Sequence, residues 1–346
     1  MNDPLVSVVI TTYNLGWCIE ETLQSVLNQT YRNLEIIVVD DASTDDTQER
    51  VAPFKDRIKY IRHASNQGLL RNAEGGPARN SGVRAAAGDY IAMLDGDDLW
   101  EPDKIAVQVE VARQFPHAGL IVTNGVSFNH EDGQIVRRTL LLDSNDLFFS
   151  TLPDDATVVA DLYYQLLHGC VIDTPSQVMI ARRVFETVGL FSECRCDDYE
   201  FYVRASAAFD IAVVNIPLVR YRQHHANLSG SSDAQFFRFV QPNVDIWRRH
   251  LLSCRPEARG IIHRQIHRAL ATAAQRAGRH SDRTWATEYL KVLLRANLRS
   301  RAAPYIAYKL LWLQRPRGLK SAVRSLIGRA GLQLPALLLV VDLVSM

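Results

Sequence analysis

The nine residues YIAMLDGDD, numbered 90–98, join an apolar strand to an acidic turn. The run YIAML predicts a buried strand, and the turn from Asp95 to Asp98 follows directly at its end. Three carboxylates in one turn repel one another and need a compensating cation, and oxygen ligands with few histidines suit Mg²⁺ or Mn²⁺. The alternative is a solvated acidic loop before the helix expected at Pro102. Because a D-x-D pattern is common, the surrounding sequence has to decide between the two.

On both sides of this turn, predicted strands alternate with predicted helices. Apolar, β-branched runs predict strands at residues 5–12, 34–39, 58–61 and 119–123. Periodic apolar stripes and capping residues predict helices at 18–28, 77–87 and 102–115, and one after Ser43 or Thr44 as cap. This alternation predicts an α/β fold with a mostly parallel, Rossmann-like sheet flanked by helices. Ligands bind such sheets at the carboxyl ends of the strands, where Tyr13-Asn14, Asp40-Asp41 and the acidic turn all fall.

The second half of the chain changes character near residue 232. Helices are predicted at residues 182–188 and 199–207, and strands at 211–214 and 218–221. Beyond Asp233 only helices with arginine-rich faces are predicted. We therefore expect an α/β domain at residues 1–232 and an all-α, basic C-terminal domain at residues 233–346.

Composition points to a soluble globular protein, with 47% apolar and 22% charged residues among 346. The net charge of +1 hides a split, because residues 255–330 carry 17 Lys or Arg against 3 acids. The five cysteines follow no paired metal-ligand spacing and are expected to be reduced thiols. No secretory signal opens the sequence, and no apolar stretch reaches the ~20 helical residues that span a bilayer. A cytoplasmic protein is expected.

Four motifs stand in order along the first two thirds of the sequence. They are VSVVITTYN (6–14), IIVVDDASTDDT (36–47), NQGLLRNAEGGPARNSGVRAAAGDYIAMLDGDD (66–98) and CDDYEFYVRA (196–205). With these motifs the sequence resembles glycosyltransferase family 2 from about residue 5 to residue 230. The resemblance implies a GT-A fold, a nucleotide-diphospho-sugar donor, inversion at the sugar carbon and a divalent cation, Mn²⁺ or Mg²⁺. The C-terminal third is not covered.

The resemblance also implies roles for the residues at the strand ends. Thr11, Tyr13 and Asp41, with Asp40 adjacent, would hold the nucleotide base and ribose, although Asp41 could instead be an acid that stabilises a turn. Arg79 would face the donor pocket and pair with the diphosphate, unless it is a solvent-facing helix arginine. Asp95 would contact the ribose or sugar. Asp97 would be the main metal ligand, with Asp98 close by.

The later motifs imply the base and a closing segment. The family's general base is the second member of a Glu-Asp pair, which reads Asp197-Asp198 here, so Asp198 would deprotonate the acceptor hydroxyl. The alternative is that these acids stabilise a helix N-terminus. Arg222 would approach the leaving group, and His224 would approach the metal or the diphosphate. For His224 the alternative is a polar loop residue. A Gln-x-x-Arg-Trp motif, which long processive synthases carry, is absent, so transfer of a single sugar is expected.

The basic C-terminal third allows two interpretations. Basic helices that carry aromatic side chains can lie on an anionic membrane surface, which would place the enzyme at the inner face of the membrane, near a lipid-linked or other glycan acceptor. Alternatively, these helices form a subdomain whose arginines are solvated. Nucleic-acid binding would fit the charge but has no recognition motif to support it.

Two other functional classes share parts of this pattern. A sugar nucleotidyltransferase would have a similar sheet and metal, but it would carry a Gly-rich triphosphate loop where this sequence reads TTYNLGW. A non-catalytic nucleotide-sugar-binding protein would not need Asp198. A glycosyltransferase acting in polysaccharide, lipopolysaccharide or other glycoconjugate biosynthesis is therefore the leading hypothesis.

Overall fold

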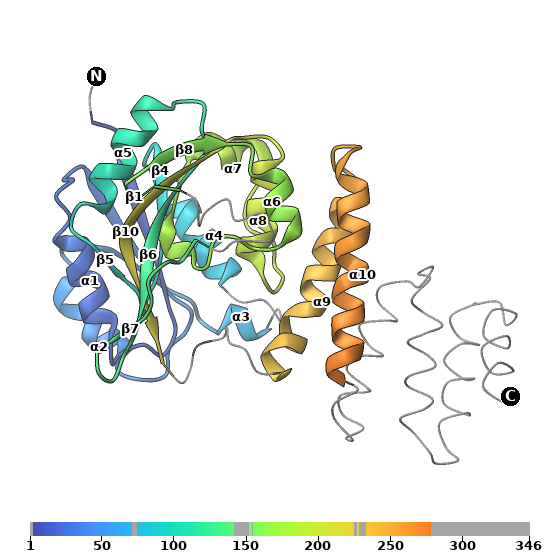
Figure 1. Ribbon diagram of the computed structural model, residues 1–346. Helices are drawn as coiled ribbons and strands as arrows, with labels where there is room; N and C mark the ends of the chain where they lie inside the picture. The colour runs from blue at the N-terminus through green and yellow to red at the C-terminus, as the bar shows by residue number, and fades with distance from the viewer. Residues whose placement is uncertain are drawn as a thin grey trace, which may run out of the picture. The chain divides into compact units, whose positions relative to one another are not determined.

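The computed structural model of the chain (Figure 1) describes residues 3–70, 75–141, 152–153, 155–224, 227 and 233–277. The chain divides into two compact units, residues 1–227 and 228–346, and each is described separately below. The domain boundary near residue 232 stays a prediction. The predicted helices beyond residue 277 lie outside the described residues.

One mixed sheet runs through the N-terminal unit. In the described residues its strand order is β3-β2-β1-β4-β9-β6-β10-β5, with β7 beside β6 and β8 beside β10. The strands are β1 (Val6–Thr12), β2 (Leu34–Asp40), β3 (Lys59–Arg62), β4 (Tyr90–Asp95), β5 (Leu99–Trp100), β6 (Leu120–Asn129), β7 (Ile135–Arg137), β8 (Thr157–Ala160), β9 (Val178–Ala181) and β10 (Ile211–Gln223).

Strand direction brings the functional strand ends to one edge of this sheet. β1 pairs in parallel with β2 and β4, and β2 pairs in parallel with β3. β9 lies antiparallel between β4 and β6, and β10 pairs in parallel with β6. Because β9 is antiparallel to both β4 and β6, these two strands run in the same direction. β10 runs in that direction too, since it is parallel to β6. The predicted mostly parallel α/β sheet is confirmed, and the carboxyl ends of β1, β2, β4 and β10 share one edge.

Helices cover both faces of the sheet; Figure 1 shows α1 and α5 on one side and α4, α6 and α8 on the other. The helices of this unit are α1 (Ile19–Leu27), α2 (Thr47–Val51), α3 (Gln67–Leu70), α4 (Gly76–Ala85), α5 (Lys104–Gln114), α6 (Tyr163–His168), α7 (Arg182–Val188) and α8 (Asp197–Ser206), with short 3-10 turns η1 (Ala52–Phe54) and η2 (Pro175–Gln177).

The central strands are apolar at nearly every position because each face meets a helix. Val8 and Ile10 belong to the hydrophobic core that includes Leu23 of α1. On the opposite face, a Cβ added at Gly82 of α4 would lie only 2.2 Å from Val9 Cγ1. Glycine at position 82 therefore lets α4 approach β1 closely enough to bury Val9.

Several local predictions are wrong at the ends of elements. Helix α2 begins at Thr47 with Asp46 at the N-cap, not after Ser43 or Thr44. Its start is set by Asp45, whose carboxylate accepts hydrogen bonds from both Thr47 N and Thr47 Oγ1. The short helix α3 was not expected, and α8 begins at Asp197, two residues before the predicted start.

The two strands predicted at 211–214 and 218–221 are one strand, β10. Its register against β6 shifts on both sides of Pro217. Proline is tolerated there because a bulge removes the need for a ladder hydrogen bond from its nitrogen. The strand therefore continues from the core to the functional edge of the sheet.

The described part of the C-terminal unit is helical, with α9 (Asp233–His250) and α10 (Ala258–Ala277) packed against each other. Val244 and Trp247 of α9 are buried, as are Ile262 and Ala273 of α10. None of the helices described in either unit combines the length and the apolar content needed to cross a membrane.

Candidate active site

The ends of β1 and β4 place Thr11 directly beside Asp95. The two residues are register partners in the parallel ladder, and Thr11 Oγ1 donates a hydrogen bond of 3.4 Å to Asp95 Oδ1. Tyr13, two residues later, is an exposed aromatic residue at 39%. The strand-end position predicted for these residues is thus confirmed by the sheet register.

Gly96 fixes the acidic turn against the end of β1. Its N–H donates to Thr11 O at 2.9 Å, and its carbonyl oxygen accepts from Thr22 Oγ1 at 2.9 Å. A Cβ at this position would lie 2.9 Å from Thr11 O, too close for any other residue. The N–H and the carbonyl oxygen of Gly96 therefore hold the turn in place, and the backbone of the turn sets the directions of its carboxylates.

Asp97 is paired with the end of β10. His224 Nε2 lies 3.0 Å from Asp97 Oδ2, and the side chains are 5% and 19% exposed, respectively. Arg222 Nε donates to the carbonyl oxygen of Asp97 at 2.8 Å, and Arg222 Nη2 donates to Glu21 Oε2 at 2.8 Å. These bonds tie β10 to the acidic turn and to α1.

Asp98 faces a different environment from its neighbour. Its side chain is fully buried, and Oδ2 accepts hydrogen bonds from Ser176 Oγ at 2.6 Å and from Thr174 Oγ1 at 3.0 Å. Oδ1 accepts from Arg222 N at 3.1 Å. Burial, with added repulsion from Asp97 and Asp95, raises the pKa of Asp98 well above its usual value.

The expected metal set of Asp97, Asp98 and His224 stays a prediction. Asp97 and His224 are neighbours, but the oxygens of Asp98 are already bonded to protein donors. Among the residues that the structure describes, no group of three or more His, Cys, Asp or Glu is arranged to hold a metal ion. A cation at this turn would need oxygens from its substrate to complete its shell.

Arg79 of α4 lies between two carboxylates rather than in open solvent. Arg79 Nη1 is 2.8 Å from Asp197 Oδ2 and Arg79 Nη2 is 3.1 Å from Asp95 Oδ1, with the Arg79 side chain 9% exposed. Burial alone would lower the pKa of Arg79, but Asp197 and Asp95 outweigh it and raise that pKa well above its usual value. The solvent-facing alternative for Arg79 is wrong.

The pKa of Asp95 is affected by burial and by the charges of several neighbouring side chains. Burial raises the pKa of its carboxyl, Arg79 lowers it, and the charges of Asp97 and Asp198 raise it further. The net direction is upward. Of these side chains, Arg79 is in direct contact with Asp95, at 3.1 Å.

The two acids that open α8 lie in contrasting surroundings. Asp197 is 1% exposed and bonded to Arg79, whereas Asp198 is only partly buried. Asp198 Oδ1 accepts a 2.7 Å bond from Tyr199 N at the start of the helix. The helix N-terminus therefore does stabilise Asp198, and its partial exposure leaves the same carboxylate reachable from solvent.

Asp40 and Asp41 also differ from each other. Asp40 is fully buried and accepts from Tyr60 Oη at 2.6 Å and from Ser43 N at 2.7 Å, so its carboxylate shapes the loop. Asp41 accepts from Gln67 N and Gly68 N, both at 2.9 Å, and lies 2.6 Å from His63 Nδ1. Its side chain remains 9% exposed.

Left-handed backbone surrounds the site at residues other than glycine. Asn14, Ala42 and Cys196 have φ values of 53°, 65° and 56°. Each sits beside a predicted site residue, namely Tyr13, Asp41 and the Asp197-Asp198 pair. For a residue such as Ala42 this conformation costs about 1–2 kcal/mol. Strain of this kind is tolerated where it aims a neighbouring side chain.

Sequence reasoning missed several residues that build the site. Thr174 and Ser176 hold Asp98, and the signal for them was present, because Thr174-Pro175-Ser176-Gln177 fits a capping box that the structure contains. Trp17, 43% exposed, packs edge-on against His130 at 4.4 Å and His224 at 5.0 Å between ring centroids. No local pattern could have indicated that these rings meet.

Comparisons with known proteins agree with this geometry. A family model described as Glycosyl transferase family 2 matches residues 7–186. An uncharacterized glycosyltransferase of Rickettsia prowazekii (strain Madrid E) is 28% identical over 273 residues, which cover 78% of this chain and 79% of that protein. An uncharacterized glycosyltransferase of Rickettsia felis is 30% identical over 228 residues, but this chain spans only 34% of its length.

One characterised relative carries a named reaction. The Escherichia coli UDP-Glc:alpha-D-GlcNAc-diphosphoundecaprenol beta-1,3-glucosyltransferase WfgD is 28% identical over 234 residues, covering 67% of this chain and 82% of that protein.

Two solved structures share the fold. S. aureus TarS 1-349 in complex with UDP-GlcNAc has a TM-score of 0.61 at 16% identity and covers 88% of this chain and 87% of its own. The mannosyltransferase PcManGT from Pyrobaculum calidifontis, in complex with GDP-Man and Mn²⁺, has a TM-score of 0.55 at 19% identity, covering 96% and 87%.

Proposed function

This chain belongs to glycosyltransferase family 2, and on that premise we propose that it moves one sugar from a nucleotide-diphospho-sugar to an acceptor hydroxyl with inversion at the anomeric carbon. The observation that carries the proposal is the buried Arg79 guanidinium at the carboxyl edge of the sheet, which joins Asp95 of the acidic turn to Asp197, the residue next to Asp198. In such folds this edge binds the ligand.

Asp198 is the proposed general base. A carboxylate that is partly exposed and stabilised at a helix N-terminus can accept the proton of an acceptor hydroxyl while that oxygen attacks the sugar. The attack comes from the face opposite the leaving diphosphate, so a single displacement inverts the configuration. Asp197 cannot share this task, because Arg79 occupies it at 2.8 Å.

Asp97 and His224 are the proposed holders of a divalent cation. Mg²⁺ and Mn²⁺ sites often use only one or two protein carboxylates and fill the shell with substrate phosphate oxygens, so a single carboxylate beside one imidazole fits. Carboxylate and phosphate oxygens suit both ions, and the support for Mn²⁺ is the mannosyltransferase of similar fold that was solved with Mn²⁺. Such an ion neutralises charge that develops on the leaving diphosphate.

Donor binding is proposed for Thr11, Tyr13, Asp41 and Asp95. Tyr13 offers an exposed ring for the base, and Asp41 an acceptor oxygen. We propose that Arg79 acts by holding Asp95 and Asp197 in place, since both of these contacts already occupy its guanidinium. Arg222 positions Asp97 in the same way, and the buried Asp40 supports the loop that presents Asp41.

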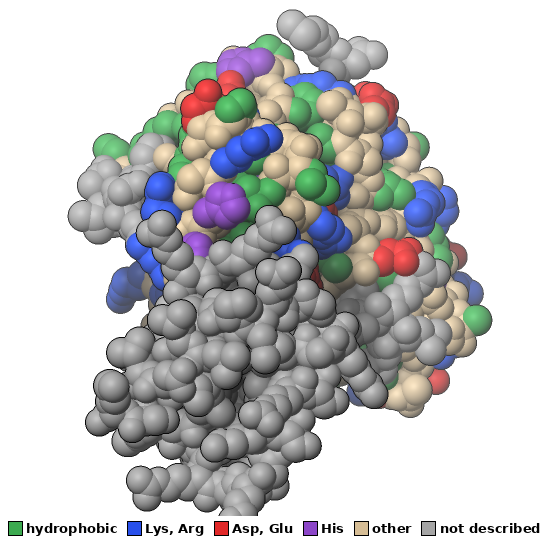
Figure 2. Space-filling view, turned by 90° about the vertical axis from the view of Figure 1, so that its right-hand side faces the viewer, with side chains coloured by type: hydrophobic (Ala, Val, Ile, Leu, Met, Phe, Trp, Pro, Cys, Tyr) green, Lys and Arg blue, Asp and Glu red, His purple; other side chains and the backbone are tan. Residues whose placement is uncertain are grey.

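A UDP-sugar donor and a lipid-linked acceptor are the substrates we propose. The support is the named reaction of the E. coli relative, which uses UDP-Glc and a diphosphoundecaprenol acceptor. The C-terminal unit adds a basic helix that would suit a membrane-bound acceptor. Five exposed basic or imidazole side chains on α10 form what we call its cationic stripe: Arg259, His263, Arg264, His267 and Arg268. Figure 2 shows separate Lys, Arg and His side chains on one face of the molecule.

That stripe has no opposite charge beside it on its own helix, because residues 258–277 contain no Asp or Glu. A basic helix of this kind binds anionic lipid headgroups. We therefore propose peripheral association with an anionic membrane surface. The basic residues beyond residue 277, which belong to the helices predicted from the sequence, lie outside the described residues.

The test is a donor screen with purified full-length protein. UDP-, GDP- and dTDP-sugars are incubated with Mn²⁺, Mg²⁺ or EDTA, and free nucleoside diphosphate is measured. We expect slow Mn²⁺-dependent release of UDP from one UDP-hexose. Release of pyrophosphate from a nucleoside triphosphate and a sugar phosphate would instead indicate a nucleotidyltransferase, and thermal stabilisation by nucleotide sugars without any turnover would indicate a binding protein.

A further inference from the structure

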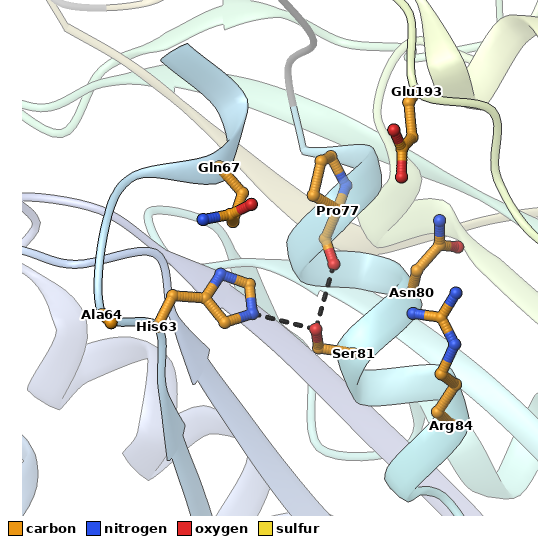
Figure 3. A pocket seen from close by; sticks show the side chains of 8 residues that line it. All are labelled: His63, Ala64, Gln67, Pro77, Asn80, Ser81, Arg84 and Glu193. Carbon is orange, nitrogen blue, oxygen red and sulfur yellow. Dashed lines mark hydrogen bonds between the residues drawn. The ribbon is translucent and has the colours of Figure 1, made fainter. Parts of the chain in front are cut away.

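Three side chains from separate elements form a hydrogen-bonded chain that ends at the proposed donor site. His63, which follows β3, lies with Nδ1 2.6 Å from Asp41 Oδ1. Its other nitrogen, Nε2, lies 2.8 Å from Ser81 Oγ on α4. Figure 3 shows the ring of His63 turned toward Ser81, whose hydroxyl also reaches Pro77 O at 3.2 Å.

The Asp41 end of this chain has a fixed hydrogen-bond direction. An ionised carboxylate carries no proton, so Nδ1 of His63 must donate to Asp41. Ser81 has one hydroxyl proton, so it either donates to Nε2 of a neutral ring, or donates to Pro77 O and accepts from the Nε2–H of a doubly protonated ring. In both arrangements Nδ1 donates to Asp41, and Ser81 holds the opposite side of the His63 ring.

Asp41 is almost fully engaged by these contacts. Oδ1 accepts from His63 and from Gln67 N at 2.9 Å, and Oδ2 accepts from Gly68 N at 2.9 Å. A carboxylate has about four acceptor positions, and among the described residues these contacts occupy three of them and leave one on Oδ2. Binding at Oδ1 sets the plane of the carboxylate and hence the direction in which that last position points.

We propose that His63, supported by Ser81, is a positioning residue that orients the Asp41 carboxylate for binding the nucleotide part of the donor. This inference rests on the proposed function, which assigns Asp41 to the donor. His63 does not touch the reacting atoms. Its loss weakens binding of the nucleotide and leaves the transfer step itself unchanged.

The surroundings of His63 allow this to be tested without steric clash. The His63 ring and Ser81 border a cavity of about 230 Å³ that Arg84 and Asn80 also line. A side chain of another shape at position 63 therefore finds room.

Two substitutions of His63 separate positioning from mere packing. The amide introduced by His63→Asn can place an N–H near the position of Nδ1. The side chain introduced by His63→Leu fills the space but has no hydrogen-bond donor. We expect His63→Leu to raise the Kd for UDP and the KM for the donor about 10-fold, with kcat unchanged. His63→Asn should stay within about 2-fold of the parent protein. Equal weakening by both variants, or none by His63→Leu, overturns the proposal.

Ser81 provides a second, milder test that holds even if His63→Leu does not fold. We expect Ser81→Ala to raise the Kd for UDP about 3-fold and Ser81→Thr, which keeps the hydroxyl, to restore it. His117→Leu, at a side chain 60% exposed, is the matched control and should leave the Kd unchanged. If Ser81→Ala and Ser81→Thr have the same Kd for UDP, Ser81 does not support His63.

The variant Asp41→Asn separates failure of this inference from failure of the proposed function. If Asp41→Asn leaves UDP binding unchanged, the assignment of Asp41 to the donor is wrong, and the proposal for His63 fails with it. If Asp41→Asn weakens UDP binding but His63→Leu does not, the donor site stands and only the role of His63 is refuted.

Discussion

His224 Nε2 lies 3.0 Å from Asp97 Oδ2, although 127 residues separate them in the sequence. Asp98, directly next to Asp97, instead accepts hydrogen bonds from Thr174 and Ser176 inside the protein. Adjacent carboxylates of one acidic motif thus have separate tasks. Asp97 keeps a side-chain exposure of 19%, as its proposed role as a cation ligand requires, and Asp98 holds the turn to the core.

Substitution of each carboxylate should reveal this division. Asp97→Asn should keep the free energy of unfolding within about 0.5 kcal/mol and reduce Mn²⁺-dependent affinity for the donor. Asp98→Ala removes the acceptor of three buried donors, Thr174 Oγ1, Ser176 Oγ and Arg222 N, so it should lower the free energy of unfolding by about 2–4 kcal/mol. Urea denaturation and isothermal titration calorimetry measure the two effects. Loss of stability in Asp97→Asn with none in Asp98→Ala would contradict the assignment.

Asp198→Asn should abolish transfer and spare donor binding. General-base catalysis contributes about 10²–10⁴-fold, so we expect kcat to fall by at least about 100-fold. Asp197→Asn is the matched comparison, because it weakens the buried contact with Arg79 and should act on stability. Turnover is measured as UDP release in the presence of acceptor. Normal turnover by Asp198→Asn would refute the base.

Arg79 should be needed for folding as much as for activity. Arg79→Met leaves Asp95 and Asp197 without their cation, and loss of one partner of a buried ion pair costs about 3–5 kcal/mol. Arg79→Lys keeps the charge but cannot bond both carboxylates as the guanidinium does, so an intermediate loss is expected. Arg84→Met, at an exposed position of the same helix, is the control in urea unfolding. Equal losses in Arg79→Met and Arg84→Met would show that the pairing adds nothing.

Much of the fold, and the strand-end positions of several candidate residues, could be predicted because they depend on local pattern. Apolar runs that end in polar residues define β1, β2 and β4, and parallel pairing then brings Thr11 beside Asp95. The antiparallel insertion of β9 could not be predicted, since its four residues form a strand only by pairing with β4 and β6 on either side.

The direction in which the Asp98 side chain points could not be predicted either. Its partners Thr174 and Ser176 are 76 and 78 residues away, and sequence spacing says nothing about which of two adjacent carboxylates turns to the core. For the same reason the contact of Arg79 with Asp197, 118 residues apart, could not be derived. Long-range partners decide these roles, and only the folded chain supplies them.

The exposed cationic stripe of α10 should bind anionic vesicles. We expect the full-length protein to float with phosphatidylglycerol liposomes at low salt and to be released at high salt. The double variant Arg264→Glu, Arg268→Glu should lose at least about 2 kcal/mol of membrane affinity. Arg32→Glu, Arg57→Glu makes the same charge change at exposed positions of the N-terminal unit. If both double variants float equally well, α10 is not the contact surface.

A buried lysine at the start of α5 should make the free energy of unfolding depend on pH. Lys104 is fully buried, donates to Gln108 Oε1 at 2.8 Å and lies 4.0 Å from the ring centroid of Trp100. Burial lowers the pKa of Lys104 well below its usual value. In the unfolded chain this pKa is about 10.4, so between the two values the unfolded state binds more protons than the folded state.

The free energy of unfolding should therefore rise with pH between the lowered pKa of Lys104 and about 10, by up to about 1.4 kcal/mol per pH unit from this group. Lys104→Met keeps the side-chain volume and removes the titrating amine, so its stability relative to the parent protein should be greatest at pH 7 and shrink by pH 9.5. Urea unfolding at pH 7, 8.5 and 9.5 measures the difference, with Lys55→Met as the exposed control. Parallel curves for the parent protein and Lys104→Met would mean that Lys104 stays charged in the fold, where Trp100 would then be its main stabilising contact.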